Sequence, residues 1–421
     1  MDTVTPPDAS VPASTPAPPL NIDPAKVRTI GVLKFRNIGD VLITTPALRV
    51  LRENFPNARI TVLVNGYTAA MVKGNPDIDE VISYESMRGS GGLGRAWHEL
   101  SFLWSIFRKF DLTIDFTSGD RAVWYSLLGG RRYRLGQRYY KWKGNNWRPR
   151  VFTHLYQMKD SGHSGGFGAD LHEVEKHLWL LEQAGIRSKS NDTSLCITTT
   201  PEEKAWASNL LKPLRDGSAS TPATAAPVSV SPTASEGAGA ASLAPLRVRR
   251  DVTPIVVVHA VSRWLWKCWD DAAMADVIDW LQEERGARVV FTTSDDPREM
   301  DKSFAILGMC RTSPLFVPGN ASLKQFAALC QQADVFFGVD TAPMHIAAAA
   351  GIPVVALFGP TNSHHWGPWT KTRTILREDC PCIANQREVC NWSATRACLA
   401  AITPERAKAA LDEWLPAPRR R

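Results

Sequence analysis

Three polar segments directly follow apolar, strand-like runs, and each carries residue types suited to group transfer. The first segment runs from Arg36 to Asp40 and ends in a carboxylate at the entry of a helical pattern. The helix dipole keeps such a carboxylate ionised, and an ionised carboxylate lining a cleft can accept a proton from a hydroxyl. A plain N-cap is the competing interpretation, and Thr45-Pro46 is a second possible helix start. Asp40 is therefore a candidate general base or a cap.

The second segment carries Asp340, Thr341 and His345 from the end of a strand into a helix that has Pro343 in its first turn. Backbone N–H groups at a helix start, together with the dipole, favour an anion such as a diphosphate. Thr341 adds a hydroxyl donor and His345 a further donor one turn later. Simple capping by Asp340 or Thr341 explains the same pattern, so a phosphate site and a plain cap both remain open.

The third segment leaves the strand that ends at His259 and contains Ser262, Arg263 and Lys267 among several tryptophans. We expect it at the same sheet edge as Asp340, where a fixed cation would neutralise the charge of a leaving phosphate. A surface loop whose tryptophans pack on the sheet is the alternative.

The elements around these segments alternate between short apolar strands and amphipathic helices, which indicates parallel sheets covered on both faces. The predicted strands are 29–35, 59–64, 80–84, 111–116, 254–259, 287–293, 335–338 and 353–358. Two doubly wound domains with a cleft at the carboxyl ends of both sheets are expected, since open α/β sheets bind ligands there. The expected divisions are a disordered leader (1–27), a first domain (28–212), a low-complexity linker (213–251), a second domain (252–402) and a terminal helix with tail (403–421).

The composition, with 44% hydrophobic and 22% charged residues among 421, is that of a globular protein and excludes collagen-like or coiled-coil chains. The longest apolar stretch, 346–358, is too short for a membrane span. The first 24 residues hold seven prolines and no apolar core of a secretory signal, so we expect a cytoplasmic chain. Within residues 216–246, Ala, Ser, Thr, Pro and Gly predominate, which favours a flexible insertion.

Two further clusters are noted for their side chains. Residues 131–150 hold eight basic and no acidic residues, interleaved with aromatics. Such a segment suits a phosphate-rich partner such as nucleic acid, a membrane face or a phosphorylated glycolipid, and a solvated loop is the alternative.

Cys380, Cys382, Cys390 and Cys398 lie within 19 residues, and in a cytoplasmic chain they suggest a structural metal more readily than disulfides. Their spacing matches no standard zinc module, so no metal site is assigned.

The segments 34–48 and 338–361, in this order, resemble glycosyltransferase family 9, the ADP-heptose:lipopolysaccharide heptosyltransferases. Trp366-Gly-Pro-Trp369, the cysteine cluster and Ile402-Thr-Pro-Glu405 are similar to the heptosyltransferase III type. The resemblance implies a GT-B fold, with two Rossmann-like domains facing across a cleft. It also implies inverting, metal-independent transfer of heptose from ADP-L-glycero-β-D-manno-heptose to a hydroxyl of the lipopolysaccharide inner core, with no cofactor. The implied enzyme is cytoplasmic and peripheral to the inner membrane, with no nucleic acid partner.

Family roles carry over by position. Asp40 matches the catalytic base, and Lys267 matches the basic residue near the diphosphate. The donor-binding set is completed by Ser262, Arg263, Ser294, Asp295, Glu299, Asp340, Thr341, Ala342 and His345. The expected acceptor-binding set is Arg36, Arg131, Arg132, Arg134, Arg138, Lys141 and Lys143. Ala342 departs from the family's usual Gly, and it is strained if that position needs positive φ but harmless within a first helical turn.

Other functions remain as alternatives. One is a GT-B transferase or an epimerase that uses a different nucleotide-sugar. The other is a non-catalytic basic module that binds membrane or nucleic acid through residues 131–150.

Overall fold

The computed structural model describes residues 22–85, 92–117, 119–137, 147–157, 171–216, 253–378 and 397–416. The chain forms two compact units, Met1–Cys196 and Ile197–Arg421. Each unit contains a six-stranded sheet in which every neighbouring pair of strands is parallel. The strand orders are β3-β2-β1-β4-β5-β6 and β12-β11-β10-β7-β8-β9, so both sheets follow the Rossmann order in which the chain reverses beside its first strand.

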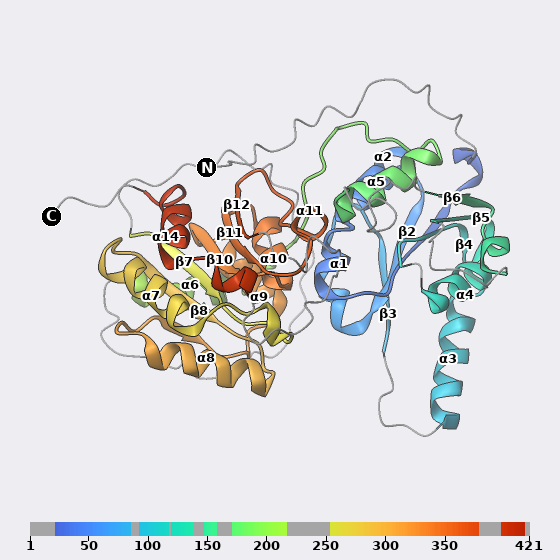
Figure 1. Cartoon of the computed structure of the whole chain (residues 1–421). Coiled ribbons are helices and arrows are strands. Elements are labelled where there is room, and N and C mark those ends of the chain that lie inside the picture. Colours follow the sequence, from blue (N-terminus) through green and yellow to red (C-terminus); the bar gives the residue numbers. More distant parts are fainter. Residues whose placement is uncertain are drawn as a thin grey trace. The chain divides into compact units, whose positions relative to one another are not determined.

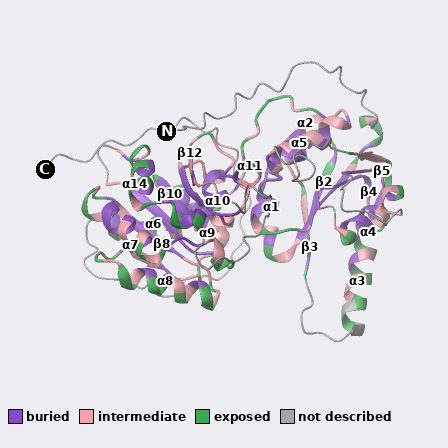
Figure 2. Ribbon diagram, viewed as in Figure 1, coloured by how far each residue is buried: buried purple, intermediate pink, exposed green. Residues whose placement is uncertain are grey.

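The strands of the first unit are β1 (Thr29–Lys34), β2 (Arg59–Asn65), β3 (Glu80–Tyr84), β4 (Phe110–Asp115), β5 (Gly130–Gln137) and β6 (His154–Tyr156). Its α-helices are α1 (Ile38–Leu42), α2 (Thr45–Asn54), α3 (Gly92–Ile106), α4 (Asp120–Gly129) and α5 (Glu173–Gln183). The residues of β1 and β4 are buried along almost their whole length, because helices cover both faces of a parallel sheet. Figure 2 shows these strands as buried and α3 as largely exposed or intermediate.

The second unit begins with α6 (Pro201–Arg215) and continues with β7 (Ile255–His259), α7 (Asp271–Glu283), β8 (Arg288–Thr292), α8 (Pro297–Met309) and β9 (Leu315–Val317). It then has α9 (Leu323–Cys330), β10 (Val335–Val339), α10 (Ala342–Ala350), β11 (Val354–Phe358), α11 (Ser363–Trp366) and β12 (Arg373–Arg377). The short α13 (Ala397–Ala400) and α14 (Pro404–Asp412) complete its described part.

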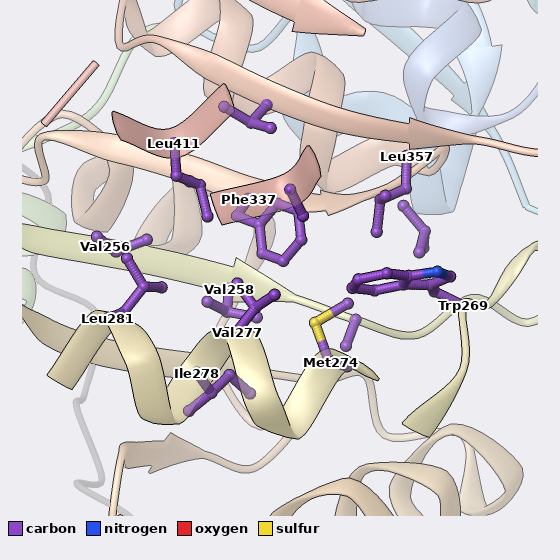
Figure 3. Close-up of a cluster of buried hydrophobic side chains, with 14 of the residues drawn as sticks. Val256, Val258, Trp269, Met274, Val277, Ile278, Leu281, Phe337, Leu357 and Leu411 are labelled. Atoms are coloured by element: carbon purple, nitrogen blue, oxygen red, sulfur yellow. The ribbon is translucent and has the colours of Figure 1, made fainter. Parts of the chain in front are cut away.

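The core of the second unit lies between its sheet and the helices α7 and α14 (Figure 3). Trp269 fills the end of this core, and its indole Nε1 lies 3.1 Å from the carbonyl oxygens of both Leu399 and Ile402. A buried indole N–H needs such acceptors, so the tryptophan also holds the segment after α13 on the core.

Helix α6 belongs to the second unit, whereas the sequence prediction ended the first domain at residue 212. The helix packs along α9 and buries Ala207, Leu211 and Leu214. The Ser208 hydroxyl donates to the Gln332 side chain over 2.9 Å, and an Arg215 guanidinium donates to the Gln332 carbonyl over 3.2 Å. The amphipathic pattern of α6 shows that it has a buried face, but not which sheet that face covers.

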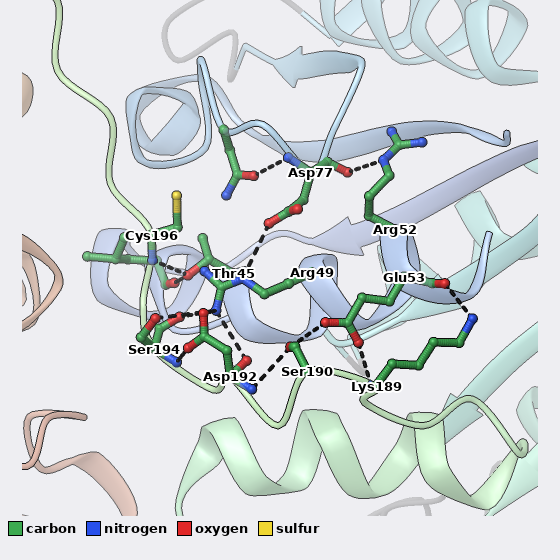
Figure 4. A network of polar contacts seen from close by, with 12 residues as sticks. Thr45, Arg49, Arg52, Glu53, Asp77, Lys189, Ser190, Asp192, Ser194 and Cys196 are labelled. Carbon is green, nitrogen blue, oxygen red and sulfur yellow. Dashed lines mark hydrogen bonds and ion pairs between the residues drawn. The ribbon is translucent and has the colours of Figure 1, made fainter. Parts of the chain in front are cut away.

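The first unit ends in a polar strap, residues 189–196, that runs along α2 (Figure 4). Arg49 donates to the carbonyl oxygens of Asp192 and Ser194, and the amide of Cys196 donates to the Thr45 hydroxyl over 3.0 Å. These contacts fix the last residues of the unit. In the described residues, no helix has the length and apolar character needed to cross a membrane.

Candidate active site

The Asp40 carboxylate lies just past the carboxyl end of β1, in the first turn of α1. Asn37 is the N-cap of this helix, and its backbone N–H donates to Asp40 Oδ2 over 3.3 Å in a capping box. Asp40 is therefore the third helical residue and not the cap. The helix is a single short turn, and Asp40 keeps a half-buried position where its second carboxylate oxygen can meet a ligand.

Asp40 lies at the reversal point of the first sheet, where β1 and β4 are neighbouring strands. Thr117 follows β4 and accepts the Phe35 N–H over 2.7 Å at its hydroxyl. The Arg36 guanidinium donates to the Thr117 carbonyl over 3.0 Å, so the two strand exits are tied together. Ligands bind at this position in open parallel sheets.

A buried charged cluster supports the strand that carries Asp40. Lys34, the last residue of β1, is 2% exposed and donates from Nζ to the Phe116 carbonyl over 3.2 Å. Its Nζ also lies 3.0 Å from Nε2 of buried His177. Burial and the nearby Lys34 charge lower the pKa of His177 well below its usual value, so the imidazole is neutral near pH 7. Burial lowers the pKa of Lys34, while the charges of Glu173 and Asp40 act in the opposite direction.

The predicted acceptor-binding arginines do not gather at this edge. Arg131 and Arg132 begin β5 at the amino end of the sheet, where both face Asp111, at 3.2 Å and 3.8 Å. Arg134 is turned toward the carbonyl oxygens of Val151 and Gly130, and burial lowers its pKa. Among the described members of the predicted set, Arg36 alone follows the carboxyl end of a strand. Arg131 and Arg132 lie at the opposite edge because they are among the first residues of β5. Arg138, Lys141 and Lys143 lie outside the described residues.

In the second unit, Lys267 and Asp340 meet at the reversal point between β7 and β10. Lys267 Nζ lies 2.5 Å from Asp340 Oδ2, and the Thr361 hydroxyl donates to the same oxygen over 2.6 Å. Both charged side chains are largely buried, at 11% and 7% exposed. A lysine held in this way keeps a fixed position, and two of its three donor protons remain to meet an anion.

Two tryptophans of the β7 exit surround the same lysine. The Lys267 ammonium lies 5.1 Å from the ring centre of Trp264 and 5.5 Å from that of Trp266. The Arg263 guanidinium stacks on the other side of the segment, 4.2 Å from the Trp264 ring centre. Cation–π contacts of this kind orient charged groups. Trp264 is 42% exposed, so it contacts the cations at the strand exit and is not buried on the sheet.

Helix α10 begins beside this pair. Its N-cap is Thr341, whose side chain makes no capping hydrogen bond to the helix and instead donates to the Val339 carbonyl over 3.4 Å. The amides of the first turn are therefore not covered by a capping side chain, which favours an anion there. Ala342 is the first helical residue, and among the described residues positive φ at non-glycine positions occurs only at Arg108 and Asn191. Ala342 is therefore unstrained. His345 is buried in the same turn, at 5% exposed.

The exit of β8 and the start of α8 bring the remaining donor-site candidates together. Glu299 lies in the first turn of α8 and is 6% exposed. Burial raises the pKa of Glu299, while a Ser294 hydrogen bond and the Arg263 charge lower it. Arg263 thus links the exits of β7 and β8. Asp295 is exposed, and Ser294 accepts the Asp296 N–H over 3.1 Å, which shapes the turn.

No group of three or more His, Cys, Asp or Glu side chains suited to a metal ion occurs among the described residues. Cys398 is buried, whereas Cys380, Cys382 and Cys390 lie outside the described residues. Sequence reasoning missed Lys34, Thr361 and the two tryptophans beside Lys267. Lys34 and Thr361 both stand at or just after the carboxyl end of a strand, the signal that was used for the other candidates.

Two Rossmann-like units, each with polar groups at the reversal point of its sheet, have the architecture of the GT-B fold. Residues 223–395 match the family model "Glycosyltransferase family 9 (heptosyltransferase)". This match covers about two fifths of the chain.

Curated proteins of similar sequence are lipopolysaccharide heptosyltransferases. The chain is 28% identical over 341 residues to lipopolysaccharide heptosyltransferase 3 of Escherichia coli K12, covering 79% of this chain and 83% of that protein. It is 19% identical to the lipopolysaccharide core heptosyltransferase OpsX of Haemophilus influenzae, with 83% and 84% covered.

Among solved structures, a family 9 glycosyl transferase of Veillonella parvula has a TM-score of 0.68, with 20% identity and coverage of 92% and 97%. The E. coli ADP-heptose lipopolysaccharide heptosyltransferase II has a TM-score of 0.64, with 19% identity and coverage of 92% and 98%. These likenesses establish the fold.

Proposed function

We propose that this chain transfers heptose from ADP-L-glycero-β-D-manno-heptose to a hydroxyl of the lipopolysaccharide inner core, with inversion. The observation that carries the proposal is the Lys267–Asp340–Thr361 arrangement at the start of α10, which fixes a cation beside helix amides. Relatives named as lipopolysaccharide heptosyltransferases support the choice of substrates.

In the proposed donor site, the diphosphate of the donor lies against the first turn of α10. Lys267 and Arg263 neutralise the charge that develops on the departing ADP. His345 donates to the phosphates, Thr341 lies beside them as the N-cap of α10, and Ser262 lines the β7 exit. The nucleoside lies toward Ser294, Asp295 and Glu299. No resident metal or organic cofactor is needed, because fixed cations and helix amides supply the electrostatic stabilisation.

In the proposed reaction, Asp40 removes the proton of the acceptor hydroxyl as its oxygen forms a bond to the anomeric carbon. The bond between that carbon and the β-phosphate oxygen breaks, and its electron pair leaves with ADP. Attack opposite to the leaving group converts a β-linked donor into an α-heptoside. Arg36, which precedes Asp40 at the same strand exit, is the residue we assign to the acceptor's phosphate or carboxylate groups.

A lipopolysaccharide core acceptor is anchored by lipid A, so the proposed enzyme works at the cytoplasmic face of the inner membrane. Nucleic acid has no part in this function.

The direct test incubates the purified full chain with ADP-heptose and lipopolysaccharide truncated at successive core sugars, and then weighs the products. One heptose should be added to one of these acceptors, and addition of EDTA should leave the rate unchanged. Absence of a heptose adduct on every acceptor would contradict the proposal.

A second measurement separates the proposal from a transferase or epimerase that uses a different nucleotide-sugar. In thermal unfolding, ADP should raise the melting temperature more than UDP. The Lys267→Met variant should lose most of the ADP effect, whereas Lys302→Met, which removes a lysine paired with Asp271, should retain it. Protection by UDP alone would favour the alternative.

A further inference from the structure

Helix α3 carries an apolar face that nothing in the described part of the first unit covers. Trp97, Leu100, Trp104 and Phe107 follow one another at helical spacing and are 75%, 59%, 81% and 52% exposed. The rings of Trp104 and Phe107 stack at 6.2 Å with an interplanar angle of 6°. Soluble surfaces show single exposed apolar residues, but four large ones on a single helix face indicate an interaction surface.

The opposite face of α3 is firmly attached to the unit, so the exposed face does not result from a loosely placed helix. Glu99 accepts hydrogen bonds from the hydroxyls of Tyr84 and Tyr125, over 2.7 Å and 2.5 Å. Phe102 and Ile106 are buried against the same aromatic cluster. The helix therefore presents its outer face in a fixed orientation, and Figure 1 shows its amino-terminal half extending past α4.

The charge around this face is basic. Glu99 is the only acidic residue of α3, and its carboxylate is held on the inner face. Arg108 is exposed directly after Phe107, and Arg121 is exposed on the neighbouring α4. The exposed Arg131 and Arg132 enter β5 next to Gly130, which pairs with Phe110. Tryptophan-rich helix faces flanked by cations are typical of segments that lie in the headgroup region of acidic membranes.

We propose that α3 docks the enzyme on an anionic phospholipid surface, with Trp97, Leu100, Trp104 and Phe107 inserted among the headgroups and the arginines at its end contacting lipid phosphates. Arg131 and Arg132 thereby acquire a role at this surface. This inference rests on the proposed function only in that the acceptor is carried on a lipid. The docking itself requires neither donor nor acceptor.

The test is flotation of the full chain with phosphatidylglycerol vesicles that contain no lipopolysaccharide. The wild-type chain should bind, and the Trp97→Ser/Trp104→Ser variant should partition at least about 10-fold more weakly, because two large apolar side chains no longer insert. The matched control is Phe304→Ser/Met309→Ser, which removes two exposed apolar side chains from α8 of the second unit, at 55% and 54% exposed. This control should bind as the wild type does.

Further readouts separate the possible outcomes. Lipid-borne bromine should quench tryptophan fluorescence in the wild type and less in the α3 variant, and urea unfolding should be the same for both. Equal vesicle binding by wild type and α3 variant would overturn the proposal. So would sedimentation showing that the face is covered by a second copy of the chain. Transfer to a soluble, delipidated core oligosaccharide should be unchanged in the α3 variant, so failure of docking and failure of the proposed transfer are distinguishable.

Discussion

Asp40, the proposed base, makes a local hydrogen bond that an asparagine can preserve. Its Oδ2 accepts the Asn37 N–H at 3.3 Å, and an amide oxygen can replace that acceptor. We therefore expect the free energy of unfolding of Asp40→Asn to stay within about 0.5 kcal/mol of the wild-type value. Its kcat should fall by a factor of about 10²–10⁴, the usual contribution of a positioned base. Rates of heptose transfer, together with ADP protection in thermal unfolding, check this. Near-wild-type turnover would remove Asp40 from the base role.

His259 makes the stability of the second unit depend on pH. Burial lowers its pKa from 6.5 to about 4, and its Nδ1 lies 3.0 Å from the Thr292 hydroxyl, which itself donates to the Val258 carbonyl. Below pH 6.5 the unfolded chain binds a proton that the folded chain does not. The free energy of unfolding is therefore not reduced by this group above pH 6.5. It falls as the pH drops from 6.5 toward 4, by about 3 kcal/mol for this group.

The measurement is urea unfolding at several pH values, following the transition that ADP stabilises. His259→Gln should flatten its pH dependence between 6.5 and 4. A variant with the same slope as the wild type would show that another group is responsible. Buried His177 contributes a dependence of the same sign to the first unit, which is why the ADP-sensitive transition is the one followed.

At the scale of elements, the close contact of β7 and β10 explains a glycine in a buried strand. A Cβ on Gly338 would lie 2.4 Å from the His259 carbonyl oxygen, a backbone atom that cannot move without disturbing both strands. We expect Gly338→Ala to lower the free energy of unfolding by about 1–3 kcal/mol and to weaken ADP binding, because Asp340 and Lys267 stand at the ends of these strands.

Gly308→Ala is the matched control, since a Cβ there meets nothing within 4 Å on helix α8. This substitution should be neutral or stabilise by up to about 1 kcal/mol, through helix propensity. Chemical denaturation of both variants, with and without ADP, is the measurement. Equal stability of the two variants would mean that the strands separate readily at this point.

The central strands were predictable because they are short apolar runs rich in β-branched residues. The predicted strand 335–338 corresponds to β10 (Val335–Val339), and 254–259 to β7 (Ile255–His259). The strand β5 (Gly130–Gln137) was interpreted only as part of a basic segment, because its arginines hide the period of two. Candidate residues at the strand ends were found by the same rule. The sequence also indicated that the Lys267 segment and Asp340 share a sheet edge, but not that Thr361 joins them, because strand order and side-chain direction decide that contact.

At the scale of the whole molecule, the boundary between the units decides which residues stabilise the donor site. Helix α6 precedes the stretch matched by the family model, yet its buried side chains lie on α9, and α9 also contacts α10. The sequence is compatible with α6 in either unit. The pattern of an amphipathic helix next to a linker shows that one face is buried, but not which element that face packs against.

This boundary predicts a division of effects between two leucines that are both fully buried, Leu211 in α6 and Leu51 in α2. Leu211→Ala should lower the free energy of the ADP-stabilised unfolding transition by about 2–5 kcal/mol, because it opens a cavity under α6. Leu51→Ala should lower the free energy of the other unfolding transition by a similar amount and leave the free energy of the ADP-stabilised transition unchanged. Urea unfolding of both full-length variants with saturating ADP measures this. If Leu211→Ala instead acted on the transition that Leu51→Ala weakens, α6 would belong with the first unit and the donor half would begin after the linker.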